Sequence, residues 1–187
     1  GCIEIHPWLS TRENLDFPTY IIFDLDPMAP ATFNDGVQVA LALKSLTDHL
    51  NLQTFPKISG ATGIHIYLPI KPLYTYQETS TFVKHLGEAV IKVLPELATN
   101  ERRVQDRTGK VYIDHLQNLK GKTIASVYSL RPFPGAPVSM PVTWRELPKM
   151  KPGSFTIKTA QARLTAIGDL FAPLLSIQQE LPLELLL

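Results

Sequence analysis

The sequence predicts one α+β domain in which a mixed or antiparallel sheet is flanked by helices. Short apolar runs that are typical of strands alternate with two longer stretches of helical periodicity. Two of the apolar runs, Tyr20–Asp26 and Val111–Asp114, end in carboxylates. We therefore expect both helices to pack on the sheet and the carboxylates to lie on one face, near the ends of these two strands.

Size and composition are those of a globular protein. The 187 residues are enough to bury a substantial core, and 44% of them are apolar and 19% charged. The net charge of +1 predicts no global basic field, so nucleic-acid binding would depend on local patches. The single cysteine, Cys2, excludes an internal disulfide and fits a reducing compartment. Gly1 in place of an initiator Met suggests an excised or processed chain.

The stretch Tyr20–Pro27 predicts the central strand. Four apolar residues precede Asp24 and Asp26, as in a strand that is buried on both faces. Side chains two apart on a strand point the same way, so the two carboxylates would repel each other. Mg²⁺ or Mn²⁺ would relieve that repulsion, whereas an Asp-Pro turn with one capping Asp is the alternative. Pro27 predicts the end of the strand.

The flanking stretches predict a short strand before this segment and a helix after it. Cys2–Ile5 alternates weakly, and Pro7 holds the preceding His6 extended. By itself His6 is interpreted as a surface or packed histidine. Asn34–Leu50 predicts a helix with Asn34 as its N-cap. The apolar stripe of this helix comprises Val39, Leu43, Leu46 and Leu50.

Gln53–Pro69 predicts two strands joined by a glycine turn. The turn contains Ser59, Gly60 and Gly63, and two glycines in so short a turn let backbone amides approach an anion. His65 lies in the second strand. A phosphate cradle made by Ser59, the turn amides and His65 is one hypothesis. An ordinary hairpin whose histidine faces solvent is the other.

A second helix and a basic cluster come next. Thr75–Leu94 predicts a helix that opens with a capping box between Thr75 and Glu78 and ends before Pro95. Its expected buried stripe comprises Phe82, Leu86, Val90 and Val93. The basic cluster comprises Arg102, Arg103, Arg107 and Lys110, and is expected to be solvated surface.

The second acid-bearing strand supplies the strongest chemical signal. Val111–Asp114 repeats the opening pattern, an apolar run that ends in a carboxylate. If the two acid-bearing strands are neighbours, Asp24, Asp26 and Asp114 could meet. Three carboxylates with two cations match the needs of a two-metal phosphoryl-transfer centre.

Irregular, proline-rich structure is predicted after residue 130. Thr123–Val127 predicts a strand before it, and Phe155–Ile157 predicts another after it. Arg131 lies in the stiffened loop, where it could clamp an anion or cap a carbonyl. Thr159–Ile167 predicts a helix. Leu181–Leu187 is too short to span a membrane and is expected to dock on the body or on a partner.

Together these stretches resemble the polymerase domain of bacterial and archaeal DNA ligase D, within the archaeo-eukaryotic primase superfamily. The matching blocks occur in the family's order over roughly Gly1 to Ile157. They are His6-Pro7-Trp8, Phe23-Asp24-Leu25-Asp26-Pro27, Lys57-Ile58-Ser59-Gly60 with Gly63 and His65, Val111-Tyr112-Ile113-Asp114-His115-Leu116-Gln117-Asn118, Tyr128-Ser129-Leu130-Arg131 and Pro134-Gly135-Ala136-Pro137-Val138-Ser139. The resemblance implies a primase-like core at 1–158 and a C-terminal helical extension at 159–187.

The resemblance implies a DNA-repair nucleotidyltransferase that adds nucleotides, often ribonucleotides, to DNA ends or a primer–template in non-homologous end joining. It implies that Asp24, Asp26 and Asp114 are catalytic and bind two Mn²⁺ or Mg²⁺ ions. It assigns nucleotide binding to Ser59, Gly60, Gly63, His65 and Arg131, and places His6 near the metals. It also implies a cytoplasmic, nucleoid-associated prokaryotic protein with no membrane partner, and a ligase module and a Ku-type protein as partners.

Two departures from the family pattern lead to alternatives. The family commonly has a Lys in the glycine turn, where this chain has Thr62, so one phosphate contact would be missing or supplied elsewhere. The family domain also carries a section before the His-Pro-Trp motif that grips the 5′-phosphate and stacks on DNA. We expect that section to be truncated, to lie on another chain or to be lacking, which makes activity of these residues alone uncertain.

Two other functions follow as hypotheses. One is a non-catalytic DNA- or partner-binding remnant of the same domain. The other is a phosphatase of the haloacid dehalogenase type, in which Asp24 would be the nucleophile. That motif calls for Thr or Val where this chain has Met28, and the later blocks do not fit it.

Overall fold

The computed structural model describes residues 2–185, apart from the side chain of Leu183. Its centre is a six-stranded sheet with the order β4-β5-β1-β3-β2-β6, in which all neighbours are antiparallel except the parallel pair β4 and β5. The strands are β1 (Tyr20–Pro27), β2 (Phe55–Ile58), β3 (Ile64–Pro69), β4 (Ala98–Thr99), β5 (Val111–Asp114) and β6 (Met140–Pro141). The predicted α+β class with a mixed sheet is confirmed.

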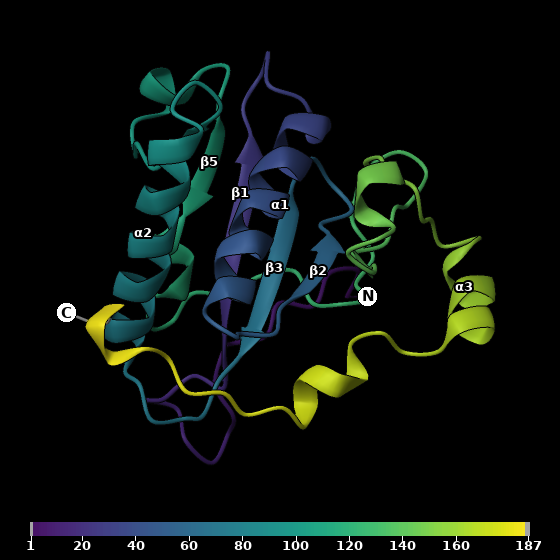
Figure 1. Cartoon of the computed structure of the whole chain (residues 1–187). Coiled ribbons are helices and arrows are strands. Elements are labelled where there is room, and N and C mark those ends of the chain that lie inside the picture. The colour runs from purple at the N-terminus through teal and green to yellow at the C-terminus, as the bar shows by residue number, and fades with distance from the viewer. Residues whose placement is uncertain (1, 186–187) are drawn as a thin grey trace.

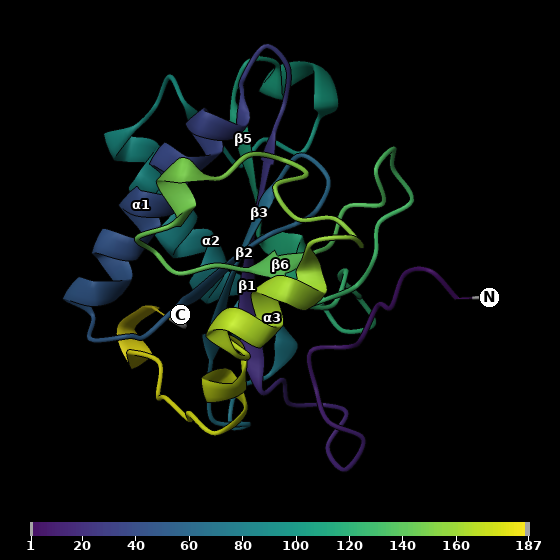
Figure 2. The same ribbon diagram turned by 90° about the vertical axis from the view of Figure 1, so that its right-hand side faces the viewer.

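Two long helices, α1 (Phe33–His49) and α2 (Tyr76–Val93), cover one face of the sheet (Figure 1). The other face is covered by the N-terminal segment and by irregular chain that follows β5 (Figure 2). A third helix, α3 (Ala160–Ile167), lies within the predicted helical stretch. No helix in residues 2–185 is both long and apolar enough to cross a membrane.

Local capping explains where the long helices begin. The Thr75 hydroxyl accepts from the amide of Glu78, whose carboxylate accepts from the Thr75 amide at 2.7 Å, so the predicted capping box is confirmed. The prediction of Asn34 as the cap of α1 is wrong. Thr32 caps this helix, because Asp35 at the third helical position completes the same reciprocal box.

Two adjacent rows of side chains cross four strands at the centre of the sheet. The apolar row consists of Ile58, Ile64, Leu25 and Ile113, which lie directly opposite one another on β2, β3, β1 and β5. The polar row, one residue away on each strand, consists of Lys57, His65, Asp24 and Asp114. Because neighbouring residues of a strand point to opposite faces, the apolar row packs under α1 and α2 while the polar row faces the other way.

Three predicted strands are absent from the residues that the structure describes. Cys2–Ile5 and Thr123–Val127 have no regular secondary structure. One backbone hydrogen bond joins them, from the Ser126 amide to the Ile5 carbonyl (2.8 Å), so no ladder forms. Phe155–Ile157 contributes one isolated bridge, between Thr156 and Pro137. Two backbone hydrogen bonds of 2.9 Å flank it, from the Val138 amide to the Phe155 carbonyl and from the Ile157 amide to the Ala136 carbonyl.

Two predictions concern the ends of packed elements. Val93 was expected in the buried stripe of α2 but is 73% exposed, because Leu94 and Leu97 just after the helix pack against the core instead. The C-terminal segment docks on the body as far as it is described. The Leu181 amide donates to the Tyr74 hydroxyl at 2.8 Å. Leu186 and Leu187 lie outside the described residues.

Candidate functional site

Strands β1 and β5 bring the predicted carboxylates together. They are antiparallel neighbours, with Asp24 directly opposite Asp114 and Asp26 opposite Tyr112. Directly opposite residues project to the same face of a sheet, and so do residues two apart on one strand. The structure therefore places Asp24, Asp26 and Asp114 on one face, away from α1 and α2, as the sequence predicted.

Burial and like charge perturb Asp24 and Asp26. Burial raises the pKa of Asp24 well above its usual value, and the charges of Asp26 and Asp114 raise that pKa further. Lys57 and Arg131 act in the opposite direction on the pKa of Asp24. Burial and the charge of Asp114 also raise the pKa of Asp26. Such a set is strained by like charge and would gain from a cation.

Asp114 is oriented by its own strand end. Its Oδ1 accepts from the Leu116 amide at 2.9 Å and from the Tyr112 hydroxyl at 3.2 Å, which leaves Oδ2 for other partners. The Arg107 guanidinium lies 3.9 Å from the centre of the Tyr112 ring, so this member of the basic cluster is packed rather than simply solvated. Within residues 2–185, no three His, Cys, Asp or Glu side chains are already arranged to hold a metal ion.

His65 links the acids to the glycine turn. It is buried opposite Asp24, with its Nε2 3.4 Å from Asp24 Oδ1. Burial lowers its pKa well below the usual value, and Lys57 and Arg131 lower that pKa further. A neutral imidazole between a lysine and a carboxylate can donate from one ring nitrogen and accept at the other. The hypothesis of a solvent-facing histidine at this position is wrong.

A hollow of about 230 Å³ opens beside the acids. Six predicted site residues line it: His6, Asp24, Asp26, Ser59, His65 and Arg131. Asp114, Gly60 and Gly63 are not in its lining. The structure thus gathers residues from the N-terminal segment, β1, the glycine turn, β3 and the loop after residue 130 around one space.

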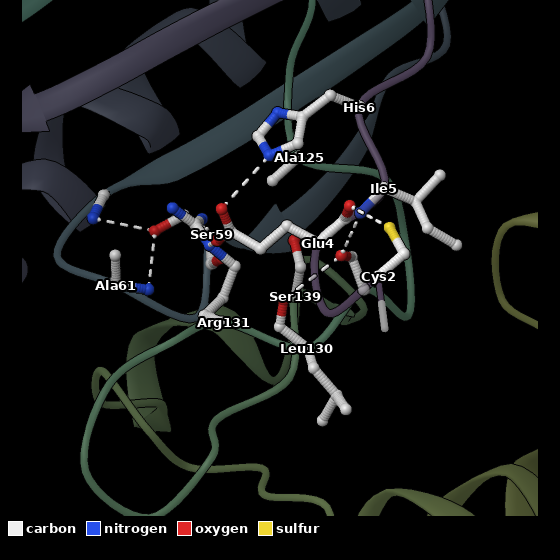
Figure 3. Close-up of polar contacts among 12 residues, drawn as sticks. Cys2, Glu4, Ile5, His6, Ser59, Ala61, Ala125, Leu130, Arg131 and Ser139 are labelled. Atoms are coloured by element: carbon white, nitrogen blue, oxygen red, sulfur yellow. Dashed lines mark hydrogen bonds and ion pairs between the residues drawn. The ribbon is translucent and has the colours of Figure 1, made fainter.

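The glycine turn is shaped by close packing. Gly60 has φ of +76°, a left-handed conformation that favours glycine. A Cβ at Gly63 would lie 2.5 Å from the Leu25 carbonyl oxygen, so the turn can lie this close to β1 only with glycine there. The Ser59 hydroxyl accepts from the amides of Ala61 and Gly63 at 3.1 Å each (Figure 3). In this structure those two amides therefore serve the turn itself.

Arg131 is held on the rim of the hollow by two partners. Its Nη1 donates to the Ser59 carbonyl at 2.8 Å, and its Nε donates to the Glu4 carboxylate. Glu4 also lies 3.2 Å from His6 Nε2, so one carboxylate connects both predicted residues (Figure 3). The carbonyl cap expected as one alternative for Arg131 is present, and the guanidinium still faces the hollow.

Three residues that organise the site were not singled out from the sequence. Glu4 joins His6 to Arg131, and Lys57 is buried beside His65. Asn118 is fully buried, where its side-chain amide donates to the Ile22 carbonyl and accepts from the Ile22 amide. The pairing of β1 with β5 ends at Asp24 and Asp114, and beyond that point the Asn118 side chain bonds to the β1 backbone in place of a neighbouring strand. Lys57 and Asn118 lie inside the matched blocks, which was the only signal for them; Glu4 lies outside those blocks, and no pattern in the sequence indicated it.

Comparison with known proteins identifies the family. The model of the LigD primase-polymerase domain matches residues 1–171. The chain belongs to this family. It is 37% identical to the bifunctional non-homologous end joining protein LigD of Bacillus subtilis, over 96% of this chain and 32% of that protein. It is 30% identical to the multifunctional LigD protein of Pseudomonas aeruginosa, over 81% of this chain and 18% of that protein.

A solved LigD domain confirms the fold. The polymerase domain of Mycobacterium tuberculosis ligase D, solved in complex with DNA, superposes with a TM-score of 0.80 at 30% identity. The match covers 87% of this chain and 57% of the solved chain. This LigD-family chain thus spans about a third of the B. subtilis protein and somewhat more than half of the solved domain.

Proposed function

We propose that this chain carries the catalytic centre of a DNA-repair nucleotidyltransferase that adds nucleotides to DNA ends. The observation that carries the proposal is the position of Asp24, Asp26 and Asp114 on one face of neighbouring strands. They lie beside a hollow that is also lined by Ser59, His65 and Arg131. Family membership and the DNA-bound state of the solved relative support DNA as the partner.

The donor set fits Mg²⁺ or Mn²⁺. Carboxylate oxygen is the ligand that both ions prefer. Burial and, after it, mutual repulsion raise the pKa values of Asp24 and Asp26, and a bound cation would offset both effects. We propose that Asp24, Asp26 and Asp114 hold two such ions. When bound, the ions would activate the primer 3′-hydroxyl and neutralise the triphosphate and leaving pyrophosphate.

The other residues of the hollow position the nucleotide. Arg131 presents a fixed guanidinium, because Glu4 and the Ser59 carbonyl hold two of its nitrogens. A guanidinium matches phosphate oxygens in charge and geometry. His65 and the Ser59 hydroxyl offer hydrogen bonds to the same phosphates, while Gly60 and Gly63 shape the turn. His6 also lines the hollow.

The wider role follows the relatives. We propose non-homologous end joining as the process, ribonucleoside triphosphates as substrates, and a ligase module and a Ku-type protein as partners in a nucleoid-associated, cytoplasmic setting. The names of the similar LigD proteins support the process. We also propose residues 1–158 as the polymerase core and 159–187 as a helical extension.

Primer extension tests the catalytic role. Purified chain is incubated with a labelled primer–template, Mn²⁺ and the four ribonucleotides, beside an Asp24→Asn/Asp26→Asn double variant of equal folded fraction. We expect extension by the native chain alone. No extension by the native chain, with Mn²⁺ binding equal in the two proteins, contradicts the catalytic role.

A second candidate is a DNA-binding module without turnover. Two observations favour it. Thr62 places no positively charged side chain in the glycine turn, and the amides of Ala61 and Gly63 donate to the Ser59 hydroxyl rather than facing an anion. Fluorescence anisotropy with labelled DNA separates the two candidates. Retained DNA binding without nucleotide incorporation supports the binding module, and incorporation excludes it.

A further inference from the structure

Lys57 is a buried charge that the proposed chemistry does not use. It is 1% exposed, although lysine is almost never fully buried without partners. Its Nζ donates to the Ala125 carbonyl at 2.7 Å and to the Ser139 hydroxyl at 2.5 Å. The same ammonium lies 5.7 Å from the centre of the Tyr67 ring. Each of these partners favours a positively charged group.

The two hydrogen bonds join separate segments to the sheet. Ala125 belongs to the extended stretch that lines the hollow. Ser139 closes an irregular hairpin, because its amide donates to the Ser129 carbonyl and its own carbonyl accepts from Tyr128. Arg131 lies within that hairpin, and its amide donates to the Pro137 carbonyl. Lys57 therefore anchors the chain that carries Arg131.

The charge of Lys57 also faces the acids. Lys57, His65, Asp24 and Asp114 form the polar row across β2, β3, β1 and β5. Two strand spacings, together about 10 Å, separate β2 from β1. Burial lowers the pKa of Lys57 well below its usual value, and the Asp24 carboxylate opposes that shift.

We propose that Lys57 is a positioning residue with two effects on the candidate site. Its hydrogen bonds hold the Arg131 hairpin against the sheet, and its positive charge offsets the carboxylates from within the fold. The proposal rests on the proposed function, because it concerns the same metal and nucleotide sites. The charge should weaken metal binding and strengthen binding of a polyphosphate anion, since its sign opposes the first and favours the second.

Replacing Lys57 by methionine tests both effects. Calorimetric titration with Mn²⁺ alone should show about threefold to tenfold tighter binding in Lys57→Met. Titration with ATP at saturating Mn²⁺ should show about tenfold weaker binding, because the variant lacks both the positive charge and the hydrogen bonds that hold the Arg131 hairpin. Amide exchange in residues 123–139 should accelerate, while exchange in β1 and β3 should stay unchanged.

Two other variants separate charge from support. Ser139→Ala removes one hydrogen bond but keeps the ammonium, so Mn²⁺ binding should stay the same and ATP binding should weaken by about twofold. Lys92→Met removes an exposed lysine of α2 and should change neither titration. If Lys57→Met does not fold, Lys57→Gln, which retains a donor, takes its place.

The native chain supplies a further measurement that needs no substitution. A protonated, buried lysine should give a slowly exchanging ¹⁵Nζ ammonium signal at neutral pH that moves in Ser139→Ala. Absence of that signal overturns the charge effect.

The outcomes are distinct. Unchanged or weaker Mn²⁺ binding by folded Lys57→Met overturns the proposed effect of the Lys57 charge. Unchanged amide hydrogen exchange in residues 123–139 overturns the proposal that Lys57 holds the Arg131 hairpin against the sheet. In both cases the proposed function still stands if the native chain binds Mn²⁺. Failure of the native chain to bind Mn²⁺ overturns the proposed function and the charge effect together.

Discussion

The apolar row and the polar row are one residue apart on the same four strands, yet they have opposite roles. Ile58, Ile64, Leu25 and Ile113 are buried beneath the helices. The polar row places an ammonium, an imidazole and two carboxylates on the other face, from Lys57, His65, Asp24 and Asp114. A register slip of one residue would exchange the rows, so packing of the first row fixes the position of the second.

The two rows of this sheet differ in function: the apolar row stabilises the fold, and the polar row forms part of the candidate site. Burial of the apolar row stabilises the fold, since each fully buried aliphatic side chain contributes about 1.5–3 kcal/mol. Burial of the acids in the polar row and their mutual repulsion oppose folding, and a bound cation would offset both effects. We therefore expect substitutions in the polar row to affect function, and substitutions in the apolar row to affect stability.

The largest expected effect comes from the polar row. Asp24→Asn should lower the rate of nucleotide addition by at least about a thousandfold, or ~4 kcal/mol of barrier, because a metal ligand is lost. Its melting temperature should equal or exceed that of the native chain, because one of three repelling charges is gone. Primer extension and thermal melting of the same preparation measure both. Asp48→Asn, at an exposed site on α1, is the matched control. Loss of activity that is explained by unfolding alone would contradict the functional role given to the polar row.

The neighbouring residue on β1 should behave in the opposite way. Leu25→Ala should lower the free energy of unfolding by about 2–5 kcal/mol, because it leaves a cavity in a fully buried row. Activity per folded molecule should stay near the native level. Urea unfolding followed by circular dichroism measures the change, with Leu41→Ala on the exposed side of α1 as control. Stability equal to that of the native chain would contradict the role given to the apolar row.

Asn118 is a buried polar residue outside both rows, and its role is structural. Asn118→Ala should cost about 1–3 kcal/mol of stability, since it leaves the amide and carbonyl of Ile22 unpaired in the core. The same urea titration measures this loss. Gln117→Ala, at the adjacent position, should cost less. Native-like stability in Asn118→Ala would show that β1 does not need this substitute partner.

The smallest effect is a dependence of stability on pH. The pKa values of Asp24 and Asp26 in the folded chain lie above their usual value of 3.8. The folded state then binds more protons than the unfolded state, so metal-free protein should lose stability as the pH rises from 3.8 through the folded pKa values. Asp24→Asn/Asp26→Asn should lack this loss. Urea titrations at several pH values between 4 and 8 measure the difference, and parallel curves for the two proteins contradict it.

Local patterns were enough to predict most of the framework. The apolar runs that end in Asp26 and Asp114 identified β1 and β5, and the capping box at Thr75 identified the start of α2. These signals lie within a few residues of the elements they define. The two-residue strands β4 and β6 carry no such pattern, because their extended form depends on the neighbours β5 and β2.

The polar row shows what local patterns could not predict. Asp24 and Asp114 could be suggested as neighbours because each ends an apolar run. Lys57 could not, because an isolated lysine is normally solvated and its hydrogen-bond partners lie 68 and 82 residues further along the chain. Glu4 was missed for the same reason, since its partner Arg131 is 127 residues away. Thr123–Val127 was wrongly predicted as a strand because its apolar residues pack without a ladder.

The central claim is that Asp24, Asp26 and Asp114 hold the cations of a nucleotidyl-transfer centre. Anomalous diffraction from crystals of the native chain soaked in Mn²⁺ tests it most directly. We expect manganese peaks within bonding distance of all three carboxylates, and their loss in Asp114→Asn crystals. Manganese bound elsewhere, or peaks that persist unchanged in Asp114→Asn, would contradict it.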